Sequence, residues 1–391
     1  MRRVYLDNNA TTRTDPAVVT KMLPYFAEEF GNASSTHSFG AEVALAVREA
    51  RRSVQALLGA AHDHEIIFTS GGTEANNAAV QAALAAASER SEIVTTAVEH
   101  PAILSLVEHL EATRDVKVHR IGVDRCGRLD MEGLRAALGP RTALVSVMWA
   151  NNETGTLFPV EEIAKLAHEA GALFHTDAVQ AAGKAPIDLK STQIDFLSLS
   201  AHKLHGPKGV GALYVRKGVK FNPLLRGGHQ ERGRRGGTEN TPGIVGFGTA
   251  AELARARMNE DVVRVATLRD RLEQRIQEEI GHCLISGDPA CRLANTLNVA
   301  FYDIEGEAVL GRLDRAGVAA STGSACTAGS TEPSHVLRAM NLPENALHGA
   351  IRFSFSHENT LEDVDRVMEA LPQIVASLRA ISQSAKQLSE A

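Results

Sequence analysis

Two residues suited to cofactor chemistry stand where apolar, strand-like segments of the sequence end. Asp177 closes the segment 172–177, and Lys203 follows the segment 196–200 within SAHKLHGPKG, 26 residues after Asp177. A lysine amine can hold an aldehyde as an imine, and a carboxylate can pair with a protonated ring nitrogen. Each residue also has a simpler interpretation, because Asp is favoured as a helix N-cap and most lysines are exposed surface residues.

A third motif, Ser70-Gly71-Gly72-Thr73-Glu74, lies between a strand-like segment and a helical stretch. Glycines allow backbone N–H groups to approach a phosphate, and a helix N-terminus adds partial positive charge. Alone, the motif is equally compatible with a plain strand-to-helix turn capped by Ser70. Together with Asp177 and Lys203 it matches the needs of pyridoxal phosphate, which requires an imine-forming lysine, a partner for the ring nitrogen and a phosphate cradle.

The sequence between residues 65 and 215 supplies the elements that must bring these motifs together. Strand-like segments recur at 65–69, 92–96, 116–121, 142–148, 172–177, 196–200 and 210–215, and helical stretches such as 160–170 separate several of them. Near-continuous apolar strands separated by helices predict an α/β fold with a buried, mostly parallel sheet. Ligands of such folds bind at the carboxyl edge of the sheet, where the polar motifs fall.

The rest of the chain predicts a loop, a linking helix and a second, smaller domain of mixed α and β structure. Residues 223–243 are rich in Gly and Arg, and a helical pattern follows over 244–280. Strand signals at 296–301 and 350–355 mix with helical ones, and Thr360 with Asp363 resembles a capping box. We expect a large cofactor domain over 13–260 and a small domain over 1–12 and 261–391.

Composition excludes several classes of protein. The 391 residues carry 41 Lys+Arg against 47 Asp+Glu, and this net charge of −6 disfavours a dedicated nucleic-acid binder, even beside the arginine-rich segment 226–237. Four cysteines with no CxxC pair favour neither a disulfide framework nor a structural zinc site. The sequence shows neither a targeting signal nor an apolar run long enough to span a bilayer, so we expect a cytoplasmic protein.

The motifs together resemble the pyridoxal-phosphate-dependent cysteine desulfurases of the NifS/IscS group, and the resemblance covers essentially the whole chain. The segments that carry it are YLDNNATT, GNASSTHSFG, FTSGGTEANN, VEHPAI, WANNETGT, FHTDAVQ, SAHKLHGPKG, GGTEN and STGSACTAGS. The stretches PLLRGGHQERGRRGGTEN and TEPSHVLRAM are most similar to the nitrogen-fixation branch, NifS. The resemblance implies the type I fold of pyridoxal-phosphate transferases, similar to class-V aminotransferases.

The resemblance also implies roles for individual residues. Lys203 would carry the cofactor, Asp177 would pair with its ring nitrogen, and Gln180 would bind its ring hydroxyl. His100, in VEHPAI, would stack on the ring and move protons, although a histidine before Pro101 equally suits a helix start. The motifs SGGTE and SAHK would provide the residues that bind the phosphate: Gly72, Thr73, Ser200 and His202.

Three further positions follow from the same resemblance. Thr238, in GGTEN, would reach the phosphate of a neighbouring subunit, which implies a homodimer. Asn151 would contact both cofactor and substrate. Arg352 would bind the substrate carboxylate, because its guanidinium fork matches two oxygens. An ion pair at the surface is the simpler interpretation of Arg352, but the apolar, strand-like stretch around it argues against exposure.

Cys326 is the expected nucleophile, within the small residues of GSACTAG on a loop at about 321–333. The resemblance implies that L-cysteine becomes L-alanine while Cys326 takes the sulfur as a persulfide. The sulfur would pass to an iron–sulfur scaffold protein of the NifU/IscU kind, for assembly of clusters such as that of nitrogenase. During this transfer Cys326 could itself become a cluster ligand. A buried, inert thiol is the commoner state of a free cysteine.

Two alternatives remain at the level of sequence. A selenocysteine lyase or another type I aminotransferase or lyase would share Asp177 and Lys203 but would not need Cys326. A non-catalytic interaction protein or RNA-binding module on the same scaffold would need none of these side chains. The presence of Lys203, Asp177, His100 and Cys326 together argues against this second alternative.

Overall fold

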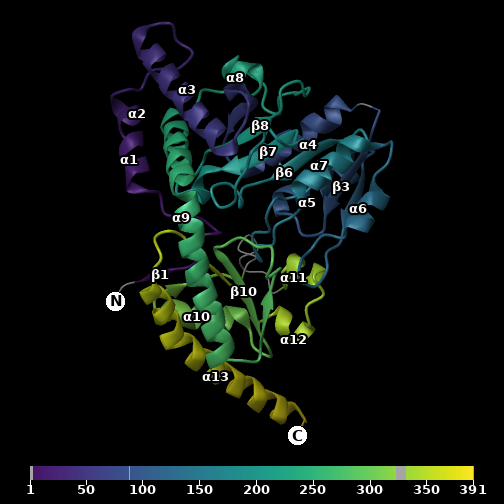
Figure 1. Cartoon of the computed structure of the whole chain (residues 1–391), viewed down its shortest axis with the longest axis vertical. Coiled ribbons are helices and arrows are strands. Elements are labelled where there is room, and N and C mark those ends of the chain that lie inside the picture. Colours follow the sequence, from purple (N-terminus) through teal and green to yellow (C-terminus); the bar gives the residue numbers. More distant parts are fainter. Residues whose placement is uncertain (1–2, 88, 323–331, 391) are drawn as a thin grey trace.

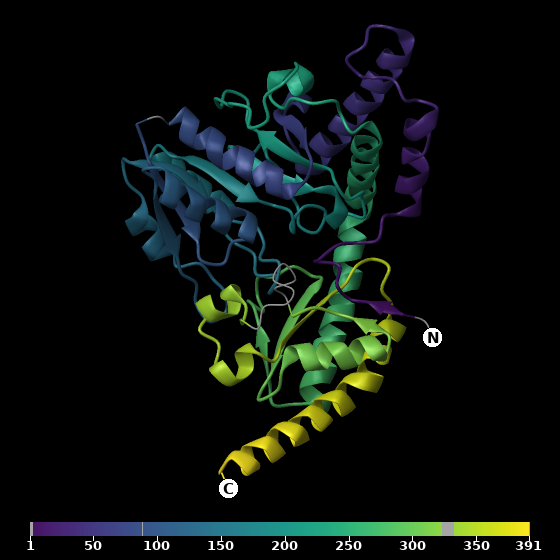
Figure 2. The same cartoon turned by 180° about the vertical axis from the view of Figure 1, so that it is seen from behind.

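The computed structural model describes residues 3–87, 89–322 and 332–390, with side chains up to residue 382 in the last helix. Helix α9 (Thr241–Glu279) runs alongside two bodies and connects them (Figures 1 and 2). One body contains a seven-stranded sheet with its covering helices. The other contains a three-stranded sheet, a two-stranded sheet and the C-terminal helix α13 (Leu361–Glu390).

The seven-stranded sheet has the order β2-β8-β7-β6-β5-β3-β4. The pairs from β7 to β4 are parallel, whereas β8 pairs antiparallel with both of its neighbours. The predicted α/β class with a mostly parallel sheet is therefore confirmed. The strands are β2 (Ile66–Thr69), β3 (Glu92–Thr96), β4 (Lys117–Ile121), β5 (Thr142–Ser146), β6 (Leu173–Asp177), β7 (Phe196–Ser200) and β8 (Gly211–Val215).

Alternation along these strands builds a core on each face of the sheet. Ile67, Ile93 and Leu144 face one core, and Phe68, Val94 and Val145 face the other. The first core contains α4 (Gly72–Ala86) and α5 (Pro101–Thr113), and alanines allow α4 to pack closely on the sheet. The opposite face is covered by helices that include α3 (Ser38–Leu58), α7 (Val160–Glu169) and the first part of α9.

The second body forms its own core around an antiparallel sheet of order β12-β10-β9. Its strands are β9 (Cys283–Ser286), β10 (Thr296–Phe301) and β12 (Ala350–Ser354). The N-terminal strand β1 (Val4–Tyr5) pairs in parallel with β11 (Val318–Ala319), so the start of the chain belongs to this body. The expected boundary between residues 260 and 261 falls inside α9 and stays a prediction.

Shorter helices complete the described chain. They are α1 (Pro16–Met22), α2 (Pro24–Ala27), α6 (Met131–Ala137), α8 (Gln230–Gly233), α10 (Gly306–Arg315), α11 (His335–Ala339) and α12 (Glu344–Leu347). The segment 223–243, expected as loop, contains the single-turn α8 and the start of α9. Within the described ranges, every helix is too short or too polar to cross a membrane.

Candidate active site

A cavity of about 390 Å³ opens at the carboxyl edge of the large sheet. The ends of β6 and β7 and the start of α4 form much of its wall, the N-terminal segment and the start of α5 contribute as well, and β12 of the second body closes one side. Its lining includes most of the residues that the sequence singled out: Gly72, Thr73, His100, Asp177, Gln180, Ser200, His202, Lys203 and Arg352. The sheet edge therefore brings together motifs that lie up to 280 residues apart.

Lys203 ends a single turn of 3₁₀ helix, Ala201–Lys203, that directly follows β7. Its Nζ donates hydrogen bonds to the backbone carbonyls of Asn9, at 2.5 Å, and Ala10, at 2.7 Å. The N-terminal segment thus holds the lysine side chain at the cavity wall. A lysine fixed in this way can present its amine to an aldehyde in the cavity.

Asp177 is the last residue of β6 and is 7% exposed. Its carboxylate accepts hydrogen bonds from the backbone N–H of Val179, at 3.0 Å, and from the Asn76 side-chain amide, at 2.7 Å. A carboxylate can accept about four hydrogen bonds, so capacity remains for a ring N–H. Asn76 belongs to the quoted motif FTSGGTEANN, but only the packing of α4 on the sheet shows that it reaches Asp177.

His100 combines the two interpretations that the sequence left open. Its Nδ1 accepts a hydrogen bond from the backbone N–H of Ala102 at 3.1 Å and so caps α5, while its ring lines the cavity. Burial lowers the pKa of His100, with nearby Lys203 acting in the same direction and Asp177 opposing. The ring is consequently neutral near pH 7, and because Nδ1 accepts the backbone N–H, the ring proton is on Nε2.

The phosphate end of the site is an adjoining cavity of about 400 Å³ between the start of α4 and the residues after β7. Gly72 is required here, since a Cβ atom would lie 2.9 Å from Cγ2 of Val179. His202 contacts the Thr11 hydroxyl at 3.0 Å, and burial together with Lys203 and Lys208 lowers the pKa of His202 to about 4. Two lysines near the N-terminus of α4 favour an anion at this place.

Arg352, in the middle of β12, also lines the main cavity and is 1% exposed. Its guanidinium forms an ion pair with Asp7 at 2.7 Å and donates to the carbonyl of Asn152 at 2.9 Å. Both contacts orient the planar group before any substrate arrives. A fixed guanidinium that lines a cavity suits recognition of a carboxylate.

Two predicted residues do not line the described cavities. The Asn151 side chain lies in the neighbouring turn, where its oxygen accepts from the backbone N–H groups of Glu153, at 2.9 Å, and Thr154, at 3.0 Å. Its neighbour Asn152 lines the cavity instead. Thr238 is exposed and lies outside the lining of both cavities, so any contact it makes with a phosphate would be in another copy of the chain.

The predicted nucleophile, Cys326, lies outside the described residues. The described chain resumes at residue 332. Contacts of Ser334 and His335 hold this part of the chain beside the cavity. Ser334 caps α11 and donates to the Glu153 carboxylate at 2.5 Å, while His335 contacts the carbonyl of Glu99 at 2.9 Å. Since Glu99 precedes the cavity residue His100, the described end of the predicted cysteine loop is anchored at the site.

The arginine-rich segment contacts the cofactor side of the molecule. Arg235 forms an ion pair with Glu74 of the SGGTE motif at 3.0 Å, and Arg234 donates to the carbonyl of His64. The carboxylate of Glu231 is buried against Arg51, with contacts of 2.6 and 2.7 Å. The contact of Arg235 with Glu74 places residues 226–237 beside the SGGTE motif.

The family model of class-V aminotransferases matches residues 4–367, and the chain belongs to this family. Among curated proteins, it is 64% identical over 382 residues to a cysteine desulfurase of Gluconacetobacter diazotrophicus, covering 98% of this chain and 96% of the relative. It is 58% identical over 382 residues to the cysteine desulfurase NifS of Azotobacter vinelandii, covering 98% and 95%. The predicted relationship to the cysteine desulfurases is thereby confirmed.

A solved structure supports the same relationship. A NifS-like protein superimposes with a TM-score of 0.90 at 38% identity, covering 96% of this chain and all of that one. Enzymes of this family use pyridoxal phosphate, so the predicted cofactor is confirmed at the level of the family. The cavity fits the group, because a cationic helix start, a buried carboxylate with spare acceptor capacity and a lysine amine all line it.

Proposed function

We propose that this protein removes sulfur from L-cysteine, releases L-alanine and keeps the sulfur as a persulfide on Cys326. The observation that carries the proposal is the cavity in which Lys203, Asp177 and His100 face Arg352. A lysine and a carboxylate suit the cofactor, and an oriented guanidinium suits an amino-acid carboxylate. The identity of 64% with a cysteine desulfurase selects cysteine as that amino acid.

The side chains divide the chemistry among them. When bound, pyridoxal phosphate supplies an aldehyde that captures the substrate amine and a ring that withdraws electrons from the substrate. Gly72, Thr73, Ser200 and His202 would hold its phosphate, and Asp177 would keep the proton on its ring nitrogen. The proposed role of Asn151 is indirect: its side chain holds the turn that places Asn152 at the cavity.

Arg352 binds the substrate carboxylate, which directs the substrate Cα toward Lys203. The amine of Lys203 would remove the Cα proton. His100, neutral because burial lowers its pKa, would donate the proton on its Nε2 at the cavity wall. The Cys326 thiolate then attacks the substrate sulfur, so an S–S bond forms as the substrate Cβ–S bond breaks. Cβ takes the electron pair and a proton, Lys203 returns a proton to Cα, and the released product is alanine.

Further parts of the proposal concern partners. We propose a homodimer in which Thr238 contacts the phosphate in the second copy. A group of exposed apolar side chains near the N-terminus is available for such a contact: Leu23, Phe26, Phe30 and Phe39. The persulfide would pass to an iron–sulfur scaffold protein in the cytoplasm, where a reducing environment keeps the thiol free. This step is where Cys326 could contact iron.

Mass spectrometry of Cys326 after incubation with L-cysteine tests the proposal. We expect a single sulfur added to the peptide that contains Cys326, and none when L-alanine replaces L-cysteine. The variant Cys326→Ala should keep the visible absorbance of the cofactor and lose alanine production. If this variant released alanine at the normal rate, the chain would act as a lyase or aminotransferase that does not need the thiol.

A further inference from the structure

Lys184 is a second lysine close to the site, and neither the motifs nor the proposed chemistry uses it. It lies in the turn after β6, seven residues beyond Asp177. Its Nζ donates a hydrogen bond to Oε1 of Gln180 at 3.0 Å. A lysine amine away from water is costly unless it has a specific partner. The contact with Gln180 therefore invites a functional explanation.

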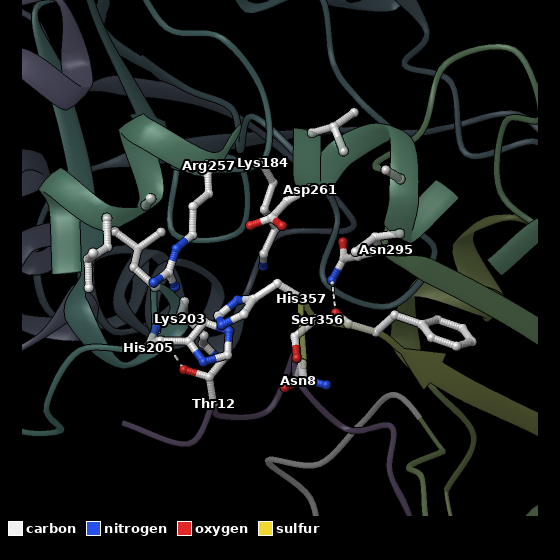
Figure 3. A pocket seen from close by; sticks show the side chains of 18 of the residues that line it. Asn8, Thr12, Lys184, Lys203, His205, Arg257, Asp261, Asn295, Ser356 and His357 are labelled. Atoms are coloured by element: carbon white, nitrogen blue, oxygen red, sulfur yellow. Dashed lines mark hydrogen bonds between the residues drawn. The ribbon is translucent and has the colours of Figure 1, made fainter. Parts of the chain in front are cut away.

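Lys184 stands between two cavities. Gln180 lines the cofactor cavity, and Lys184 lines a smaller cavity of about 80 Å³ behind it. Figure 3 shows this smaller cavity, with Lys184 and Lys203 reaching it from different segments. The hydrogen bond from Lys184 to Gln180 thus links a residue of the smaller cavity to a residue of the cofactor cavity.

The two hydrogen bonds of Gln180 define how its amide group is turned. Nε2 donates to the carbonyl of Asn9 at 2.9 Å, and Oε1 accepts from Lys184. A carbonyl oxygen accepts and an ammonium group donates, so the reverse orientation would oppose two acceptors at one end and two donors at the other. The amide nitrogen carries a second N–H, which this orientation leaves on the nitrogen side of the group.

The same carbonyl of Asn9 also accepts the hydrogen bond from Lys203, at 2.5 Å. Lys184, Gln180, Asn9 and Lys203 therefore form one continuous series of hydrogen bonds. A change at Lys184 alters the Gln180 amide first. Through the shared carbonyl it then reaches the lysine that carries the cofactor.

We propose that Lys184 is a positioning residue, which fixes the Gln180 amide so that its N–H group faces an anionic oxygen on the ring of the bound cofactor. The inference rests on the proposed cofactor chemistry of Lys203 and Gln180. Lys184 itself does not touch the cofactor. A donor held toward that oxygen strengthens cofactor binding without any rearrangement when the cofactor enters.

The electrostatic surroundings of Lys184 agree with this role. Burial lowers the pKa of Lys184 to about 7, and the nearby cations Lys203 and Arg352 act in the same direction. Burial and the two nearby cations disfavour a charged amine at this position. The hydrogen bond to Gln180 is the contact that explains why a lysine stands there.

A double-mutant cycle tests the proposal through cofactor binding. Apoprotein of the variants Lys184→Met, Gln180→Ala and the double variant is titrated with pyridoxal phosphate, and visible absorbance gives the dissociation constant. We expect each single variant to weaken binding about 5-fold, the usual size for one hydrogen bond, and the double variant to be no weaker than Gln180→Ala. Lys184→Arg should bind the cofactor nearly as tightly as the unchanged protein.

Lys190→Met is the matched control, because it removes an exposed lysine six residues away. The proposal is overturned if Lys184→Met binds the cofactor as tightly as this control. It is also overturned if the losses in the double variant multiply, since Lys184 would then act independently of Gln180. If Lys184→Met does not fold, Lys184→Leu, which likewise has no donor, takes its place in the cycle with the same expectations. Failure of sulfur transfer to Cys326 would leave this result unaffected.

Discussion

The two ends of the active site are built in different ways. At the cofactor end, Asp177 and Lys203 stand at or just after the ends of neighbouring parallel strands, and Asp177 takes one hydrogen bond from Val179, two residues away. At the substrate end, Arg352 depends on Asp7 and Asn152, which lie 345 and 200 residues away in the chain. One sheet sets the positions of Asp177 and Lys203, with the N-terminal segment holding the Lys203 amine, whereas Arg352 stands on β12 of the second body and takes its contacts from both bodies.

This difference predicts different failures. A change at the cofactor end should remove the cofactor while the fold persists, because the sheet edge exists without the side chain. A change at the substrate end should leave the cofactor in place and weaken recognition of the amino acid. Each variant below is therefore measured by both cofactor absorbance and steady-state kinetics.

The largest effect is expected for Lys203→Ala. The variant loses both the covalent attachment of the cofactor and the base that removes the Cα proton, so activity should fall by about three orders of magnitude or more. The visible absorbance of lysine-bound cofactor should disappear. Lys190→Ala, which changes an exposed lysine, should have neither effect. Retention of the absorbance in Lys203→Ala would show that another residue carries the cofactor.

Arg352→Lys should have the second largest effect. Lysine keeps the charge but lacks the planar fork, so we expect kcat/KM for L-cysteine to fall about 100-fold, mainly through KM. The dissociation constant of pyridoxal phosphate should change little, because Arg352 is not among the residues that line the phosphate end of the site. A normal KM with loss of cofactor would reverse the assignment of the two ends.

A smaller effect is expected for Asp7→Asn. The amide keeps the shape of the side chain but removes the charge that faces Arg352 at 2.7 Å. We expect KM for L-cysteine to rise about tenfold while cofactor binding is retained, because the guanidinium loses the ion pair that helps to orient it. Asp365→Asn, at an exposed ion pair with Arg275, is the control and should leave KM unchanged. Equal kinetics for both variants would mean that the ion pair with Asp7 does not orient Arg352.

The contrast also explains what the sequence could predict. Asp177, Lys203 and the SGGTE motif were recognisable because their role depends on a position at a strand end, which hydrophobic patterns reveal. The same patterns predicted the mostly parallel sheet. They could not reveal Asn76 beside Asp177, Lys184 behind Gln180 or Asp7 on Arg352, since these contacts arise from tertiary packing. Asn151 was carried over from a motif in which its neighbour Asn152 lines the cavity, and only the turn geometry separates the two.

Glu99 is a buried acid beside the active site and directly precedes the cavity residue His100. Its carboxylate accepts hydrogen bonds from the Thr96 hydroxyl, at 2.8 Å, and the Met148 N–H, at 2.9 Å, both in the large body. Its backbone carbonyl contacts His335, the first residue of α11, at 2.9 Å. Burial raises the pKa of Glu99 from 4.5 to about 8, against the effect of the two hydrogen bonds.

The raised pKa of Glu99 predicts that the free energy of unfolding depends on pH. Folded protein keeps the proton of Glu99 while unfolded protein releases it above about pH 4.5, so this contribution to stability is complete below that pH and is lost as pH rises through about 8. The loss amounts to about 1.4 kcal/mol per pH unit within this window. Glu99→Gln keeps the acceptor oxygen and cannot titrate, so its free energy of unfolding relative to the unchanged protein should improve from about pH 5 to about pH 8 and level off above that pH. Urea unfolding at several pH values measures this difference. Glu111→Gln is the control: Arg120 lowers the pKa of Glu111, so the effect of this variant on stability falls at acidic pH. A difference that stays constant across this pH range would mean that Glu99 is ionised in the folded protein. The site would then hold a buried charge next to His100 instead of a neutral acid.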